Sequence, residues 1–135
     1  MKFQNKQQTR QSGFSLTELL IALVIVGILV AMALPKFTSV INKTKTTEAK
    51  LMLDQVYMLE EAYRDEHDFY TKTLSEIGYR QDKLVTEGGK ARYKVEVIEV
   101  SDTSFIGQAT AVVDIYKNGK TDVWTINQRK ELIQH

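Results

Sequence analysis

Gly13-Phe14-Ser15-Leu16-Thr17-Glu18-Leu19-Leu20-Ile21-Ala22-Leu23-Val24-Ile25-Val26-Gly27-Ile28-Leu29-Val30-Ala31-Met32-Ala33-Leu34-Pro35 is the stretch that decides the fold of this chain. It holds a single charged side chain, Glu18. As an α-helix the segment from Phe14 to Leu34 spans about 31 Å, which is close to the hydrocarbon thickness of a bilayer. The sequence therefore predicts a helix that is able to cross a membrane.

Glu18 is the feature of this segment that needs an explanation. An ionisable group at membrane depth costs a few kcal/mol on insertion scales, so it indicates a functional role and a partner. The alternative is a carboxylate that sits at the headgroup boundary and needs no partner. Both interpretations stay open from the residues alone.

The charges around the segment indicate its orientation. Lys2, Lys6 and Arg10 precede Phe14, and every Asp and Glu follows it. Since basic flanks stay on the cytoplasmic side, we expect an N-in, C-out topology with everything after Lys36 outside.

The composition excludes several classes of function. The 135 residues suit one domain plus an anchoring segment. The formal charge is +1, and removal of the first 13 residues with their three cations would make it −2. Neither value indicates a specific nucleic-acid partner. The absence of cysteine excludes disulfides, thiolate metal sites and cysteine nucleophiles.

A secretory signal peptide is the main alternative to a retained anchor. It too has a basic start and an apolar run, and Ala31-Met32-Ala33 provides an A-x-A cleavage site. In that case signal peptidase would release a soluble binding protein or enzyme after Ala33. The length of the apolar run, Glu18 within it and a helical pattern that continues past Pro35 favour the retained helix.

The residues Gly13-Phe14-Ser15-Leu16-Thr17-Glu18-Leu19-Leu20, behind a short basic leader, resemble the class III signal of type IV pilins and of type II secretion pseudopilins. The resemblance implies that residues 1–13 are a leader. A prepilin peptidase would cut between Gly13 and Phe14 and methylate the new terminus, giving N-methylphenylalanine. The precursor would lie in the bacterial inner membrane and the assembled pilus on the cell surface.

The resemblance also implies a partner for Glu18. Its carboxylate would meet the Phe14 ammonium of a neighbouring copy in a homopolymeric helical filament. Two charges in a low-dielectric bundle are tolerated when they are paired, and loss of one partner costs roughly 3–5 kcal/mol. The other implied partners are the inner-membrane assembly platform and, before assembly, the lipid bilayer.

Gly27 and Pro35 bracket the part of the helix where a bend is expected. Glycine weakens helix propensity, and proline removes a backbone donor. By resemblance this part would unwind and let the filament stretch. Alternatively, Gly27 permits close helix packing and Pro35 adds only a gentle kink.

Residues 36–70 continue the helix in amphipathic form. Apolar side chains recur at steps of three and four, with charged side chains mostly between them. We expect one helix from Phe14 to near Phe69, half membrane or filament-core segment (14–35) and half domain core. Residues 71–91 are expected to form a surface loop, with a capping box at Thr73-Leu74-Ser75-Glu76 and a short turn ending near Gly78.

Residues 92–135 are expected to hold an antiparallel sheet and a tail. The period falls to two from Tyr93, and again from Phe105 to Ile115, where the small residues in the middle would let a helix approach. Asn118-Gly119 predicts a hairpin turn before a third strand, Asp122 to Ile126. The predicted fold is α+β, a long helix on a three-stranded sheet, as in the pilin fold.

No catalytic residue, metal site or cofactor is predicted. Asp114, Asn118 and Asp122 could offer calcium ligands, but their spacing does not fit an EF-hand and a plain turn is favoured. Glu66-His67-Asp68 is interpreted as a solvated helix end. The predicted function is structural, as a pilus subunit for motility, adhesion or DNA uptake, with a pseudopilin of type II secretion as the alternative.

Overall fold

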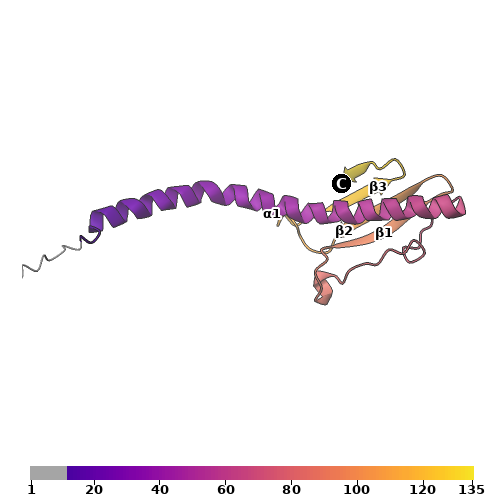
Figure 1. The fold of residues 1–135 in the computed structure, drawn as a ribbon, viewed down its shortest axis with the longest axis horizontal. Coiled ribbons are helices and arrows are strands. Elements are labelled where there is room, and N and C mark those ends of the chain that lie inside the picture. The colour runs from indigo at the N-terminus through magenta and orange to yellow at the C-terminus, as the bar shows by residue number, and fades with distance from the viewer. Residues whose placement is uncertain (1–11) are drawn as a thin grey trace, which may run out of the picture. The chain divides into compact units, whose positions relative to one another are not determined.

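The computed structural model describes residues 12–135. Most of the predicted 1–13 leader, including Lys2, Lys6 and Arg10, lies outside the described residues. Figure 1 shows one long helix and an antiparallel sheet, which confirms the α+β prediction. The elements are α1 (Leu16–His67), the short 3-10 helix η1 (Val85–Glu87), β1 (Tyr93–Val100), β2 (Phe105–Ala111), β3 (Val123–Asn127) and β4 (Leu132–Gln134).

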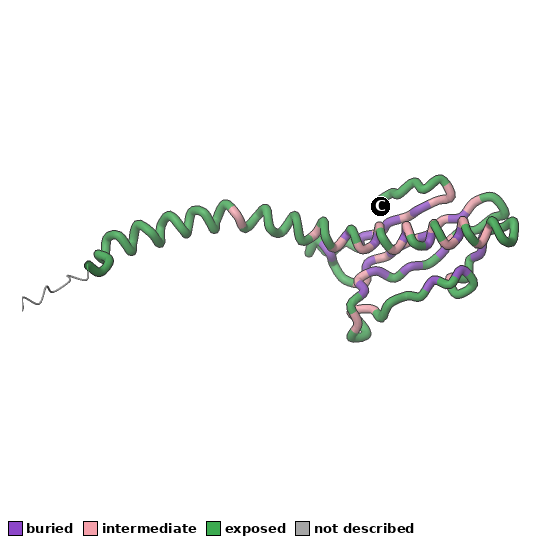
Figure 2. Tube along the Cα trace, viewed as in Figure 1, coloured by how far each residue is buried: buried purple, intermediate pink, exposed green. Residues whose placement is uncertain are grey.

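Helix α1 is 52 residues long and contributes to two compact units, residues 1–38 and residues 39–135. It ends at His67, two residues before the predicted position. Asp68 takes a positive φ of 67°, and its N–H donates to the Arg64 carbonyl at 2.7 Å, which closes the helix. Figure 2 shows that nearly all of residues 12–38 are exposed, whereas buried positions recur along α1 in the second unit.

The sheet has four strands in the order β1-β2-β3-β4, all antiparallel, so the prediction of three strands was wrong. β4 is only three residues long, and all three are exposed. It was missed because a strand with no buried face has no apolar alternation that a sequence pattern can detect. The three other strands begin at or within one residue of the predicted positions, but β2 ends at Ala111 and not at Ile115 as predicted.

The core of the second unit lies between α1 and one face of the sheet. Ala49, Leu53 and Val56 of α1 are completely buried in one cluster with alternate residues of β1, β2 and β3. Gly107 of β2 lies directly under the helix, because a Cβ atom there would come within 3.5 Å of Val56 and 3.6 Å of Leu53. The predicted close approach of the helix to small residues of this strand is confirmed.

The connection between β2 and β3 differs from the prediction. β2 ends at Ala111, and residues 112–122 form a long loop in place of a tight turn at Asn118-Gly119. The Asp114 carboxylate shapes this loop, because it accepts hydrogen bonds from the Gly119 N–H at 2.6 Å and the Asn118 N–H at 3.2 Å. These bonds lower the pKa of Asp114, the Gly119 bond having the largest effect.

The segment between α1 and β1 is a loop that contains a turn at residues 74–78 and η1. Gly78 ends the turn with a φ of 76°. The predicted capping partner was Thr73, but the Glu76 carboxylate accepts the hydroxyl of Thr71 instead. Further along, the side chain of Gln81 bonds the backbone of Tyr93 and Val95 and so covers part of the outer edge of β1.

Candidate functional site

The amino-terminal end of α1 is built around a reciprocal pair of hydrogen bonds between Ser15 and Glu18. The Ser15 N–H donates to Glu18 Oε2 at 2.8 Å, and the Glu18 N–H donates to Ser15 Oγ at 3.2 Å. This is a capping box, which satisfies two backbone donors that a helix start otherwise leaves free. The geometry explains why α1 begins at Leu16.

The capping role of Ser15 was not predicted from the sequence. The signal was present, because Ser15-Leu16-Thr17-Glu18 fits the Ser-x-x-Glu pattern before an apolar run. The same pattern was used to predict a turn at residues 73–76, where the side chains bond differently.

The capping box holds the Glu18 carboxylate in the first turn of the helix, where the backbone dipoles favour negative charge. Ser15 donates to Oε2 only. Within residues 12–135, no ion pair includes Glu18. The carboxylate is therefore positioned by its own chain, and its charge has no counter-ion in that part of the chain.

Gly13 and Phe14 lie just before the helix, in an exposed and irregular segment. The Phe14 side chain is 89% exposed. In the chain from Met1 to His135 the nitrogen of Phe14 belongs to a peptide bond, so it carries no charge that could pair with Glu18. The structure thus places the predicted cleavage and assembly residues within a few positions of one another, without an ion pair between them.

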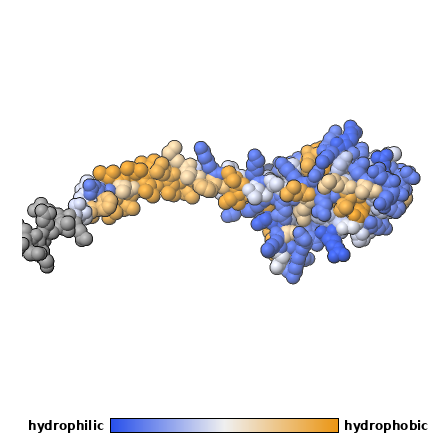
Figure 3. Space-filling view, viewed as in Figure 1, coloured by the Kyte–Doolittle hydropathy of each residue, from blue (hydrophilic) through white to orange (hydrophobic). Residues whose placement is uncertain are grey.

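The surface that follows Glu18 is apolar and uncovered. Figure 3 shows hydrophobic residues along the first part of α1. The most apolar 18-residue window of this helix has a mean hydropathy of 2.7 and is 0% buried within the chain. By length and composition it is the one helix in residues 12–135 that is able to cross a membrane.

Gly27 and Pro35 lie inside this helix without interrupting it. A Cβ atom at Gly27 would meet nothing within 4 Å. Near Pro35, the Thr38 hydroxyl lies 3.1 Å from the Leu34 carbonyl oxygen and 3.2 Å from that of Pro35, so it donates into the turn that the proline weakens. Bending or stretching of this segment stays a prediction.

The carboxylates once considered for calcium serve two different networks. Asp114 bonds the backbone of its own loop. Asp122 is buried and accepts hydrogen bonds from Tyr93, Trp124 and Gln134. Among residues 12–135, no three His, Cys, Asp or Glu side chains are placed to hold a metal ion.

The Glu66-His67-Asp68 segment is an exposed end of α1. The His67 ring stacks on Tyr63 with a centroid distance of 4.1 Å, and its Nδ1 lies 3.0 Å from the Tyr63 carbonyl oxygen. These contacts order the last turn of the helix.

Comparison with known proteins finds two similarities. Residues 8–34 match the family described as the prokaryotic N-terminal methylation motif. Over 86 residues, 64% of this chain, the sequence is 35% identical to the type IV major pilin protein PilA of Myxococcus xanthus (strain DK1622). The match covers 37% of the length of that protein.

Proposed function

We propose that this chain, whose methylation motif and similarity to a major pilin support a type IV pilin, is a structural pilus subunit made as a membrane-anchored precursor. The observation that carries the proposal is the pairing of an uncovered apolar helix with a lone carboxylate held at its start by Ser15. A soluble protein would hide the helix, and a cleaved signal would not need the carboxylate.

Maturation supplies the missing counter-ion. Prepilin peptidase would hydrolyse the bond between Gly13 and Phe14, which frees the amino group of Phe14, and would then methylate it. The resulting ammonium remains positive and becomes available to the Glu18 carboxylate of a neighbouring subunit. Each charge would otherwise be buried unpaired in the filament core, so the pair favours a single packing register.

Polymerisation would bury the apolar surface that the single chain leaves open. In the bilayer the chain would have an N-in, C-out topology. With the help of the inner-membrane assembly platform, the anchor helix would leave the bilayer and pack among copies of itself. A head-to-tail contact that does not close gives an open helical fibre. The filament would serve motility, adhesion or DNA uptake.

The amino terminus of the mature protein tests the processing step. Mass spectrometry of the protein purified from membranes or filaments should find N-methylated Phe14. Leu34 at the terminus would contradict the proposal and indicate a secreted soluble protein. Shed filaments should be absent by electron microscopy when the chain is deleted, and they should reappear on complementation.

The role of the Glu18 charge can be separated from its role as a cap. Glu18→Gln keeps an acceptor for the Ser15 N–H, since Gln also forms capping boxes, but removes the charge. We expect normal processing and at least a tenfold loss of filaments. Ser15→Ala removes the hydroxyl and keeps the charge, so it should assemble far better. Normal filaments from Glu18→Gln would show that the carboxylate acts only as a cap.

A further inference from the structure

Glu60 is a carboxylate in the interior of the second unit. It lies on the core side of α1, in register with Leu53 and Val56, and its side chain is 0% exposed. Its Oε2 accepts the Thr71 N–H at 3.2 Å. Its Oε1 is the one buried side-chain polar atom in residues 12–135 to which no protein group donates. An unsatisfied buried carboxylate oxygen is costly, so this one calls for an explanation.

The loop after α1 closes over this carboxylate. Besides its bond to Glu60, Thr71 donates its hydroxyl to Glu76. The neighbouring Tyr70 hydroxyl donates to Glu61 at 2.6 Å and accepts from Arg64 at 3.0 Å. Glu60 and Glu61 thus hold two successive loop residues against α1.

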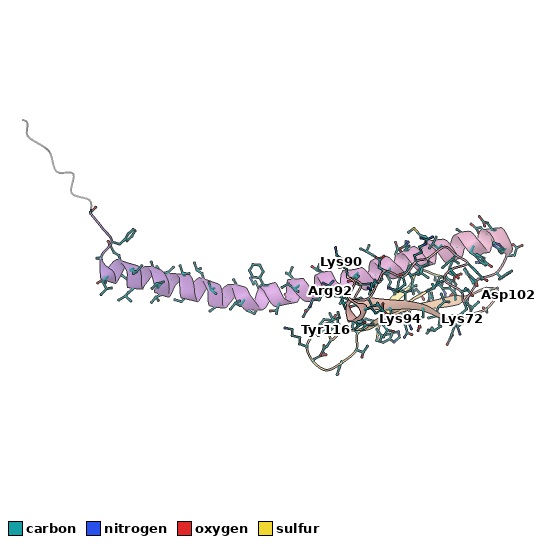
Figure 4. The ribbon with its side chains drawn as sticks, turned by 90° about the horizontal axis from the view of Figure 1, so that it is seen from below. Lys72, Lys90, Arg92, Lys94, Asp102 and Tyr116 are labelled. Carbon is teal, nitrogen blue, oxygen red and sulfur yellow. The ribbon has the colours of Figure 1, made fainter. Side chains whose placement is uncertain are left out.

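Beyond the effect of burial, two negative charges raise the pKa of Glu60 further. They are Glu61 from α1 and Glu76 from the loop. Burial raises the pKa of Tyr63 on α1, and the charges of Glu76 and Glu60 add to this shift. Lys72, labelled in Figure 4, is exposed and lines a groove with Glu96 at the edge of β1.

The sheet presents aromatic surface to the same end of α1. Phe105 of β2 packs against Tyr70 at 4.9 Å and against Tyr57 at 6.4 Å between ring centroids. Burial raises the pKa of Glu60 to about 7; the Thr71 bond opposes this shift, and the charges of Glu61 and Glu76 add to it.

We propose that Glu60 is a proton-binding site that latches residues 68–79 onto α1, closed when Oε1 carries a proton and loosened when the carboxylate is ionised. The protonated group buries no charge between Glu61 and Glu76. The ionised group gains hydration only if Thr71 and its neighbours move away from the helix. The latch therefore couples the surface loop to pH near neutrality.

The direction of the pH effect follows from linkage. The pKa of Glu60 is above 4.5 in the closed state and near 4.5 once the loop opens and water reaches it. The closed state then binds more protons, so its stability is complete below about pH 4.5 and declines as pH rises through about 7. With these two values, the closed-to-open ratio falls about tenfold between pH 6 and pH 8.

Two measurements on the full chain in detergent micelles test the site. A carbon-13 NMR titration of the Glu60 carboxyl should give a midpoint near 7. The hydrogen-exchange protection factor of the Thr71 amide, corrected for intrinsic rates, should fall about tenfold from pH 6 to pH 8. A midpoint near 4.5 would overturn the proposal.

The matched variants are Glu60→Gln and Glu66→Gln. The first keeps an acceptor for Thr71 and cannot ionise, so its protection factor should not change with pH. The second removes an exposed carboxylate six residues further along α1 and should keep the wild-type response. If Glu60→Gln unfolds the chain, the NMR midpoint of Glu60 in the wild-type protein still tests the proposal. If a folded Glu60→Gln variant still lost Thr71 protection between pH 6 and pH 8 as the wild type does, the latch would be refuted.

Discussion

The Tyr93 hydroxyl donates a hydrogen bond of 2.6 Å to Asp122 Oδ2, joining the start of β1 to the residue before β3, and both side chains are buried. The same oxygen accepts the indole N–H of Trp124 at 2.9 Å, and Oδ1 accepts the Gln134 amide at 2.7 Å. One carboxylate therefore ties β4 to the rest of the sheet. Burial and Asp122 together raise the pKa of Tyr93, so its hydroxyl stays a donor at neutral pH.

Tyr93→Phe should destabilise the second unit by about 1–2 kcal/mol, because Asp122 loses a short hydrogen bond inside the core. Trp124, the only tryptophan, lies in this network and reports its unfolding by fluorescence during urea denaturation. Tyr116→Phe is the control, since that hydroxyl is exposed in the 112–122 loop (Figure 4) and accepts from Gln134 instead of bonding Asp122. Equal midpoints for the two variants would contradict the role given to Asp122.

Gly107→Val should cost about 1–3 kcal/mol by overpacking, although valine is a good strand residue. A Cβ atom at this position would lie 3.2 Å from Ile126 Cγ2 and within van der Waals contact of two α1 side chains. Thr110→Val, on the outer face of the same strand, should be nearly neutral. A chemical denaturation series that ranks the two variants equally would argue against a tight fit of α1 on the sheet.

Glu48 of α1 makes two contacts with Arg92, the residue just before β1. Its Oε1 accepts the Arg92 N–H at 2.7 Å, and its Oε2 lies 3.1 Å from Arg92 Nη1. Glu48→Gln keeps an acceptor and should cost less than about 1 kcal/mol, since the guanidinium is substantially exposed. Glu48→Ala leaves the N–H without its acceptor and should cost more. High salt should reduce the difference in the free energy of unfolding between wild type and Glu48→Gln, because salt screens the ion pair. A difference that grows with salt would show that the ion pair is not stabilising.

Gly27→Ala should raise the helicity of the single chain slightly, because alanine is the better helix former and the position is open. Any loss of filaments must then come from contacts between subunits. We expect fewer filaments by electron microscopy, with unchanged or higher helicity by circular dichroism in micelles. Normal filament numbers would favour a role for Gly27 other than close helix packing.

The buried Oε1 of Glu60 has no hydrogen-bond partner in residues 12–135, and this lowers the free energy of unfolding of the second unit. Glu60→Leu should raise the urea midpoint at pH 8, where the wild-type carboxylate is mostly ionised, and should raise it less at pH 5. The loss of the Thr71 bond works against the gain at both values. A larger gain at pH 5 than at pH 8 would contradict the assigned direction.

The long helix, its apolar first part and the three strands that pack on it could be predicted from the sequence, because periodic burial leaves a periodic pattern of apolar residues. The lone charge of Glu18 in an apolar run was also visible in the sequence, whereas Gly13 and Phe14 were named only through the resemblance to type IV pilins. The tertiary structure alone decided the rest. β4 has no buried face, the 112–122 loop depends on where the Asp114 carboxylate finds its N–H donors, and the isolation of Glu60 depends on a loop that folds back over it. Such features are set by which groups meet once the chain folds back on itself, and the apolar periodicity of the sequence does not record them.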